Sequence, residues 1–286
     1  MYRKATTMRV LLIGGTGYIG SAVLKALRER GHAPHALVRS EKSAESAALA
    51  GAEPVLGDIA DVPWLTRQFA ATDGAVNLGA LDAGGEDAVI DAAVAAFGET
   101  AKPFVYTGGI WMWGNGTDIT EHDPFQPPAI VGWKVQRQDR VLRSGVKASA
   151  IAPAVVYGHG QGIPAGMFTY GPRTQDGALR LIGDGQQHWA TVHVDDLADL
   201  YLRVLERAPG GATYIGASGL SPTVREMDLA AAERVAPETP DESRERLGVY
   251  LADALLLDQQ ATGATARQAL GWIPTRPDVL TELARR

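Results

Sequence analysis

A set of regularly spaced glycines near the amino terminus is the first feature of this sequence that could do chemistry. Gly14, Gly17 and Gly20 follow the mostly apolar run 8–13, and apolar residues recur at helical spacing over 22–27. A strand that turns sharply into a helix can bring its backbone amides against a pyrophosphate, and only residues without Cβ allow that close approach. We therefore expect this turn to bind a phosphate-containing cofactor.

A cation stands where the next strand is expected to end. The apolar run 35–38 is followed directly by Arg39 and Ser40. In dinucleotide-binding folds a carboxylate at this point binds the ribose hydroxyls of NAD, whereas a cation pairs with the 2′-phosphate of NADP. Arg39 and Ser40 therefore predict NADP(H) as the cofactor; the alternative is an arginine that is simply solvated at a strand end.

The elements that must position these residues alternate between strand and helix. Further strand candidates lie at 53–56, 74–78, 104–106 and 148–152, with helical patterns between them. Alternation at that pace predicts a parallel sheet that helices cover on both faces. We therefore predict an α/β fold, a Rossmann-type doubly wound parallel sheet with a small C-terminal substrate-binding region.

The expected domain boundary falls where glycine and proline crowd the chain after the sixth strand. We predict a dinucleotide-binding domain over 8–157, to which 190–216 return, and a smaller substrate-binding region made of 158–189 and 217–286. Residues 1–7 are mostly polar and without pattern, and we treat them as a leader.

Composition excludes several classes of function. Among 286 residues, 27 Lys and Arg against 33 Asp and Glu give a net charge of −6, and the scattered basic residues disfavour nucleic acid or an anionic membrane as partner. Without cysteine, thiol catalysis and cysteine-bound metals are excluded. No apolar stretch approaches the ~20 residues of a membrane span, and no secretory pattern is present, so we expect a cytoplasmic monomer or homodimer.

The glycine turn, Gly14-Gly15-Thr16-Gly17-Tyr18-Ile19-Gly20, resembles the cofactor loop of the extended and atypical short-chain dehydrogenases/reductases, the epimerase/dehydratase-like group. Segments 57–59, 77–80, 105–107, 153–158 and 193–198 resemble later family segments in the same order and spacing. The resemblance implies cofactor contacts from Gly14, Thr16, Gly17, Tyr18, Ile19, Asp58, Ile59, Leu78, Gly79, Ala80, Lys134, Pro153, Val155 and Val156.

The catalytic residues are where this sequence departs from that group. Its members usually carry Tyr-x-x-x-Lys with a Ser or Thr, in which the lysine lowers the tyrosine pKa for proton exchange. Here Lys134 is present, but Ile130 stands at the tyrosine position and Gly109 at the serine position. The resemblance therefore implies Lys134 at the nicotinamide ribose and near the hydride acceptor, as in the isoflavone-reductase-like group, without the usual proton relay. A solvated helix position is the alternative for Lys134.

Three other side chains are candidates for the missing proton donor. Thr107 shares a strand face with position 109, Tyr157 ends the sixth strand, and His188 lies in a segment that faces the substrate in the family. Each candidate also has a simpler explanation. The Thr107 hydroxyl is not an acid at neutral pH, and the tyrosine at the position of Tyr157 is usually structural in the family. A histidine such as His188 is more often an ordinary surface residue.

A second difference from the family pattern limits the class of substrate. Family members that act on nucleotide sugars place an arginine near position 189 to bind a diphosphate, and Trp189 cannot do so. Trp111, Trp113 and Trp133 lie in segments that border the family's active site, with Ile130 close by in sequence. We therefore expect an apolar or aromatic small molecule as substrate, although core packing is an equal alternative for each tryptophan.

Two other chemistries lack support. Asp195 and Asp196 beside His193 resemble metal ligands, but adjacent carboxylates at a helix start more often cap backbone N–H groups, so we predict no metal site. No Gly-x-Ser-x-Gly turn marks a hydrolytic nucleophile.

These expectations predict an NADP-dependent oxidoreductase of the atypical short-chain type, acting on a small, mostly apolar carbonyl, imine or activated alkene. Two alternatives stay open. One is an isomerase, epimerase or dehydratase that uses the dinucleotide transiently, and the other is a non-catalytic NADP-binding regulatory protein, suggested by the loss of the Tyr and Ser partners.

Overall fold

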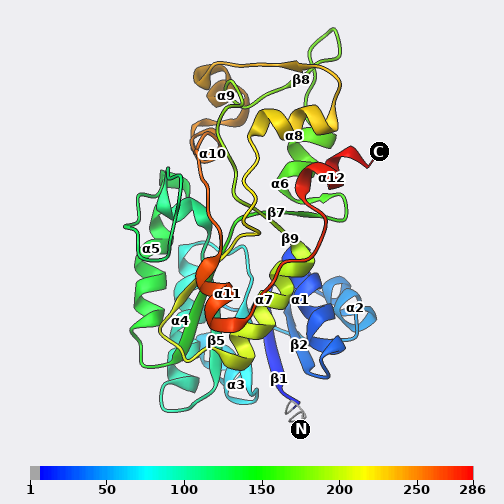
Figure 1. Ribbon diagram of the computed structural model, residues 1–286. Helices are drawn as coiled ribbons and strands as arrows, with labels where there is room; N and C mark the ends of the chain where they lie inside the picture. Colours follow the sequence, from blue (N-terminus) through cyan, green and yellow to red (C-terminus); the bar gives the residue numbers. More distant parts are fainter. Residues whose placement is uncertain (1–6, 286) are drawn as a thin grey trace. The chain divides into compact units, whose positions relative to one another are not determined.

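The chain divides into two compact units, each assembled from three separate segments (Figure 1). The computed structural model describes residues 7–285, so residues 1–6 of the predicted leader lie outside the described part. Unit 1 comprises the chain up to 107 together with 136–151 and 198–213, and unit 2 comprises 108–135, 152–197 and 214–286.

A seven-stranded sheet is the framework of the α/β part. Its strands are β1 (Arg9–Ile13), β2 (Ala33–Val38), β3 (Glu53–Leu56), β4 (Gly74–Asn77), β5 (Pro103–Thr107), β6 (Lys147–Pro153) and β10 (Thr213–Gly216). Their spatial order is β10-β6-β5-β4-β1-β2-β3, and the neighbouring pairs from β3 to β6 are parallel. The predicted Rossmann-type sheet is confirmed. Because the strand order reverses between β1 and β4, the carboxyl ends of these strands form the point at which such sheets bind ligands.

Helices cover both faces of this sheet within unit 1 (Figure 1). They are α1 (Tyr18–Glu29), α2 (Glu41–Leu49), α3 (Val62–Ala70) and α4 (Ala83–Phe97), joined by parts of α5 (Ala129–Leu142) and α7 (Val194–Arg207). On the side of α3 and α4 the core includes Phe69, whose ring meets Phe97 and Phe104 edge-on at 5.4 and 5.8 Å. Each aromatic pair adds about 0.5–1.5 kcal/mol beyond its buried area, which stabilises the packing on this face.

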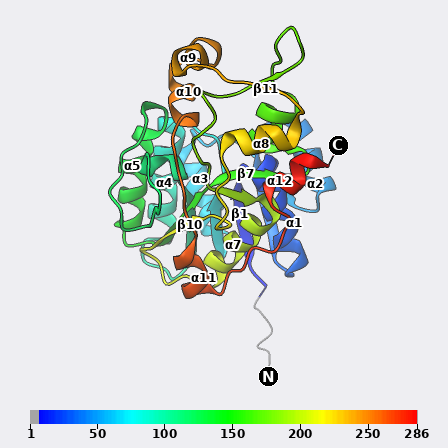
Figure 2. The same ribbon diagram turned by 45° about the horizontal axis from the view of Figure 1, so that its top comes forward.

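Unit 2 has its own core and two small parallel sheets. The strand pairs are β7 (Val155–Gly158) with β9 (Thr191–His193), and β8 (Leu179–Arg180) with β11 (Val235–Ala236). Its other elements are η1 (Ile110–Trp113), α6 (Gly162–Pro164), η2 (Ala165–Thr169), α8 (Val224–Ala231), α9 (Pro240–Leu247), α10 (Val249–Leu255), α11 (Ala264–Leu270) and α12 (Val279–Ala284). Figures 1 and 2 both show α8 beside α12, and residues of the two helices share one core cluster.

None of the helices within residues 7–285 combines the length and the apolar character that a membrane crossing requires.

The division of the chain differs from the predicted domains. Residues 108–135, 152–157, 190–197 and 214–216 group with unit 2, whereas the sequence predicts them in the dinucleotide-binding domain. The Gln259 side chain donates hydrogen bonds to the carbonyls of Ile110 and Gly114, and Gly116 donates its N–H to the carbonyl of Asp258. Gln259 and Gly114 are 145 positions apart in the sequence. No local sequence pattern predicts a contact over such a separation.

Candidate functional site

The turn from β1 to α1 depends on glycine at two positions. Gly14 has a φ of +78°, and a Cβ there would come within 2.8 Å of the backbone of Leu78 and Gly79. A Cβ at Gly20 would overlap the carbonyl oxygen of Gly14, to which Gly17 donates its N–H at 3.1 Å. The strand and the helix can therefore meet at this turn only with glycine at these positions.

The amino terminus of α1 fits the phosphates of a dinucleotide. The N-cap residue is Gly17, no side-chain hydrogen bond caps the helix, and a helix start of this kind can bind an anion. Thr16 and Gly17 are exposed at the turn, and Tyr18 and Ile19 are half-buried in the first turn of the helix. The structure thus brings the predicted loop residues to one helix start.

Arg39 and Ser40 line a cavity of about 610 Å³ in unit 1, together with Glu41, Leu56, Gly57 and Asp58. The Arg39 side chain is exposed, and within residues 7–285 it forms no ion pair with a carboxylate. Ser40 is the N-cap of α2, its hydroxyl accepting from the N–H of Ser43 at 3.3 Å. The guanidinium of Arg39 and the amino terminus of α2 lie beside the same cavity. Both would stabilise a phosphate group bound there.

The loop after β3 supplies another wall of this cavity. Asp58 accepts a hydrogen bond from the N–H of Ala60 at 2.9 Å, which holds the turn. Ile59 is half-buried against the core of unit 1. A Cβ on Gly57 would overlap the ring of Trp64, so the loop can lie against this ring only because residue 57 is glycine.

The segment after β4 lies next to the glycine turn. Leu78 donates its N–H to the carbonyl of Ile13 at 2.8 Å, and the side chain of Asn77 accepts from the N–H of Gly79 at 3.1 Å. Leu78 and Gly79 are half-buried, and Ala80 is exposed. The three predicted residues therefore follow the carboxyl end of β4, beside the point where the strand order reverses.

The Thr107 hydroxyl is engaged within unit 1. It donates to the carbonyl of Asn77 and lies 2.8 Å from the hydroxyl of Tyr201, which is buried. Burial raises the pKa of Tyr201 above its usual range. These contacts support a structural role for Thr107 in holding β4 and β5.

Lys134 and Ile130 lie one turn apart on α5, as the spacing predicts. The Lys134 ammonium lies 4.8 Å from the centre of the Trp133 ring, and the Trp133 Nε1 donates to the carbonyl of Ile130 at 3.1 Å. All three side chains are half-buried in unit 2. The ring of Trp133 thus lies beside the ammonium at the family's lysine position, and the branched aliphatic side chain of Ile130 stands at the tyrosine position.

The tryptophans of η1 differ from each other in exposure. Trp113 is buried, and its ring meets Phe125 edge-on at 4.7 Å. Its Nε1 is buried without a hydrogen-bond partner in the described part of the chain. Trp111 is half-buried against the core of unit 2. Of the two, Trp111 has the surface with which a ligand could make contact.

Tyr157 and Trp189 pack into the core of unit 2. The Tyr157 hydroxyl donates to the carbonyl of Pro277 at 2.9 Å, and burial raises the pKa of this phenol further above its usual range. The Trp189 Nε1 donates to the carbonyl of Leu255 at 3.0 Å, and the ring is 2% exposed beside Phe168. These contacts support structural roles for both residues.

The predicted cofactor residues after β6 are divided between strand ends in unit 2. Pro153 closes β6, and Val155 begins β7, donating its N–H to the carbonyl of Ala190 at 2.9 Å. Pro153 and Val155 are buried, whereas Val156 is half-buried. Val156 is therefore the member of the three with accessible side-chain surface.

His188 forms a pair that the sequence analysis did not foresee. Its Nδ1 lies 2.9 Å from a carboxylate oxygen of Asp258, which also accepts the backbone N–H of His188. The ring is partly exposed beside a cavity of about 430 Å³ lined also by Ser221 and Glu226. A carboxylate that fixes one ring nitrogen leaves the other to exchange a proton.

The sequence of residues 10–216 matches the NAD dependent epimerase/dehydratase family. The chain belongs to this family. The predicted resemblance is therefore confirmed, and the family's members among the relatives include reductases and epimerases.

Individual relatives of this epimerase/dehydratase family member span most of its length. An uncharacterized protein of Schizosaccharomyces pombe is 29% identical, covering 97% of this chain and 98% of its own. The 4-hydroxy-2-methyl-3-oxo-4-farnesyl-3,4-dihydroquinoline-1-oxide ketoreductase of Stigmatella aurantiaca is 27% identical over 74% of this chain and 69% of its own. The structure of MoeE5 in complex with UDP-glucose and NAD has a TM-score of 0.77 at 19% identity, covering 96% of each chain.

Sequence reasoning missed three residues of this family member that the structure brings into view. Asp258 is the partner of His188 from 70 positions away, Trp64 supports the loop at Gly57, and Asp228 is wholly buried. Both Asp228 oxygens lack a hydrogen-bond partner among the described residues. Only the position of Asp228 within an apolar helix pattern could have signalled this burial.

Proposed function

We propose that this family member is an NADP(H)-dependent oxidoreductase that acts on a small, mostly apolar carbonyl, imine or activated alkene. The observation that supports NADP(H) is Arg39, an exposed guanidinium without a carboxylate partner in the described chain, at the rim of the cavity beside Ser40. A dianionic 2′-phosphate would satisfy this cation, whereas the ribose hydroxyls of NAD would not.

The residues of unit 1 would bind the cofactor in three parts. The amides at the start of α1 would hold the pyrophosphate, Arg39 with Ser40 the 2′-phosphate, and Asp58 with Ile59 the adenine side. A nicotinamide dinucleotide supplies or accepts a hydride when it is bound. We assign Lys134 to the ribose hydroxyls and to polarising the substrate oxygen.

The proton donor is a separate proposal. Thr107 is held by Asn77 and Tyr201, and Tyr157 is buried with a raised pKa, so neither suits proton exchange near neutral pH. His188 keeps one ring nitrogen outside its bond with Asp258 and is partly exposed. We therefore assign the role of proton donor to His188.

The names of two relatives support reduction of a ketone. One is the ketoreductase of Stigmatella aurantiaca, and the other, 28% identical over 73% of this chain, is the 2-alkyl-3-oxoalkanoate reductase of Stenotrophomonas maltophilia. The substrates named in both carry a ketone beside an alkyl or prenyl chain. The half-buried surfaces of Trp111 and Trp133 and the side chain of Ile130 are of a kind that suits such a substrate.

The first test is calorimetric titration of the cofactor-stripped protein with NADPH and with NADH. We expect NADPH to bind at least about tenfold more tightly, which corresponds to about 1.4 kcal/mol. Oxidation of NADPH is then followed at 340 nm with an alkyl-substituted β-keto ester as substrate. Binding of neither dinucleotide would reject the proposal, and binding without any turnover across ketones, imines and alkenes would favour a regulatory role.

A further inference from the structure

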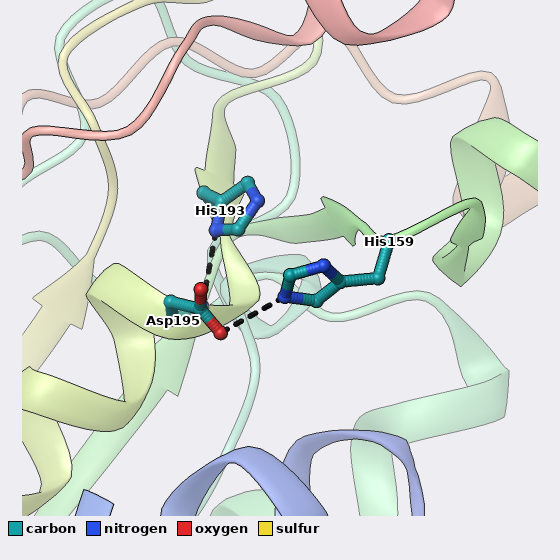
Figure 3. A group of neighbouring side chains, drawn as sticks. All are labelled: His159, His193 and Asp195. Carbon is teal, nitrogen blue, oxygen red and sulfur yellow. Dashed lines mark hydrogen bonds and ion pairs between the residues drawn. The ribbon is translucent and has the colours of Figure 1, made fainter.

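Two histidines and one aspartate meet at the ends of the small parallel sheet of unit 2 (Figure 3). His159 follows β7, His193 ends β9, and Asp195 lies in the first turn of α7. Because Tyr157 pairs with His193 in the register of β7 and β9, the ends of the two strands lie next to each other. The cluster therefore results from strand pairing between segments more than 30 residues apart.

The donor atoms of this cluster are close enough to share one ion. The His159 Nε2 lies 3.1 Å from Oδ1 of Asp195, and one ligand atom from each of the three residues lies within 4.8 Å of the others. Ligands bound at about 2.0–2.2 Å in a tetrahedral zinc site are roughly 3.3–3.6 Å apart. Small side-chain movements would bring all three atoms onto one ion.

Two of the three side chains are already held in place. The His193 ring is buried against Gly158, where a Cβ would lie 2.5 Å from Nε2, and it meets the Tyr157 ring edge-on at 5.4 Å. Arg276 lies 3.4 Å from Oδ2 of Asp195, which leaves Oδ1 directed at His159. Such outer contacts orient ligands in metal sites.

His159 adopts an unusual backbone conformation. Its φ is +56°, and it is the one non-glycine residue in the described chain with a positive φ, between Gly158 and Gly160. Its backbone N–H donates to the Glu282 carboxylate at 3.1 Å, although the ring is largely exposed. His159 and Gly160 are the central residues of a tight turn whose ends, Gly158 and Gln161, form an antiparallel bridge, and both have a positive φ. This turn sets the left-handed conformation of His159, whose imidazole lies beside Asp195.

An ion pair between His159 and Asp195 is the simpler explanation of part of this geometry. It does not account for the second imidazole, whose ring centre lies 5.3 Å from that of His159. The prediction that Asp195 or Asp196 caps α7 is wrong. His193 Nδ1 accepts the N–H of Asp195 at 3.1 Å, and Asp196 accepts the N–H groups of Thr275 and Arg276.

We propose that His159, His193 and Asp195 bind a divalent late transition-metal ion, with Zn²⁺ as the representative. Two imidazole nitrogens and one carboxylate oxygen suit Zn²⁺ and leave a coordination position for water. The ion would replace the hydrogen bond that His193 Nδ1 accepts from Asp195 and the proton that His159 Nε2 shares with Asp195. The site would fasten the loop after β7 to the start of α7, independently of the proposed oxidoreductase activity.

The test is calorimetric titration of chelator-treated, tag-free protein with Zn²⁺, compared with two site variants and a control. We expect one equivalent to bind, and His159→Gly and Asp195→Asn each to weaken binding at least about tenfold. His159→Gly suits the positive φ, so the metal-free variant should unfold at or above the wild-type temperature. His122→Ala, which removes an exposed histidine elsewhere in unit 2, should bind Zn²⁺ as the wild type does.

Two further readouts separate a bound ion from a structural ion pair. Zn²⁺ should raise the unfolding temperature of the wild type but not of His159→Gly. Co²⁺ should give the visible absorption of a four- or five-coordinate site in the wild type and lose it in the variant. Undiminished Zn²⁺ binding by His159→Gly, or no binding by the wild type, would overturn the assignment.

Discussion

Arg39 is the residue on which the choice between NADP and NAD depends. It follows β2 directly, and the cavity beside it is also lined by the helix-capping residue Ser40. Glu41 and Asp58 line the same cavity, but Asp58 is used by the turn, where it accepts from Ala60. Among the residues that line this cavity Arg39 alone is a cation, so its replacement removes the positive charge there.

The substitution Arg39→Asp should raise the Kd of NADPH about 10–100-fold, because hydrogen bonds to charged groups contribute about 1.5–3 kcal/mol. The Kd of NADH should change little. Arg39→Lys, which keeps a cation without the guanidinium fork, should lose less NADPH affinity. Equal losses for both dinucleotides in calorimetric titrations would reject a 2′-phosphate contact.

Lys134 is expected to act on both binding and turnover. Lys134→Ala should lower kcat by about 10²-fold and weaken NADPH binding, because the ammonium that Trp133 holds is removed. Steady-state kinetics and titration together measure the two effects. If affinity and kcat both stay at wild-type values, Lys134 is not part of the site.

The proton-donor assignment predicts a different pattern for His188. His188→Asn should lower kcat while leaving the Kd of NADPH unchanged. Asp258→Asn should lower kcat by a smaller factor, since the carboxylate acts through its bond to His188 Nδ1. Steady-state kinetics in which both variants keep the wild-type kcat would exclude His188 as the donor.

At the scale of elements, the turn between β1 and α1 carries the cofactor site. Gly20→Ala places a methyl group against the Gly14 carbonyl, which shifts the helix start from the strand end. We expect a loss of about 1–3 kcal/mol in the free energy of unfolding and loss of NADPH binding. Chemical denaturation and titration measure these two effects.

The matched control for this substitution is Gly166→Ala. No atom lies within 4 Å of a Cβ built on Gly166, which lies in η2 and has no positive φ. Its stability and NADPH affinity should be unchanged or slightly increased, because alanine is favoured over glycine in helical turns. If both variants behave alike, the effect at Gly20 is not steric.

At the scale of the whole molecule, the buried carboxyl of Asp228 couples stability to pH. Burial raises its pKa to about 8, against 3.8 for the exposed group, although Arg246 acts in the opposite direction. Between these two values the folded chain keeps a proton that the unfolded chain releases. The free energy of unfolding should therefore fall as pH rises from about 4 toward 8, by up to about 1.4 kcal/mol per pH unit from this group.

The substitution Asp228→Asn removes this proton and should flatten the dependence. Urea denaturation at pH 6, 7, 8 and 9 measures it, and the stability of Asp228→Asn relative to the wild type should increase toward pH 8 and then level off. A constant difference across this range would show that Asp228 does not titrate between its folded and unfolded values.

The sequence by itself determined the α/β sheet, the glycine turn and the family. These depend on interactions within about 30 residues: apolar runs of strand length, the glycines at 14 and 20, and the step from Val38 to Arg39 all lie within one β-α-β unit. Local patterns of this kind report directly on backbone geometry. The absence of the family tyrosine at Ile130 was also readable, because it depends on a single helical turn.

Only the tertiary structure decided which distant residues share a site. Trp189 could have faced a ligand or the core, and the Leu255 carbonyl that its Nε1 reaches comes from a separate segment. His159, His193 and Asp195 meet because β7 pairs with β9, and His188 meets Asp258 across 70 positions. Pairing and packing between distant segments depend on the whole fold, so these contacts cannot be predicted from the spacing of the residues along the chain.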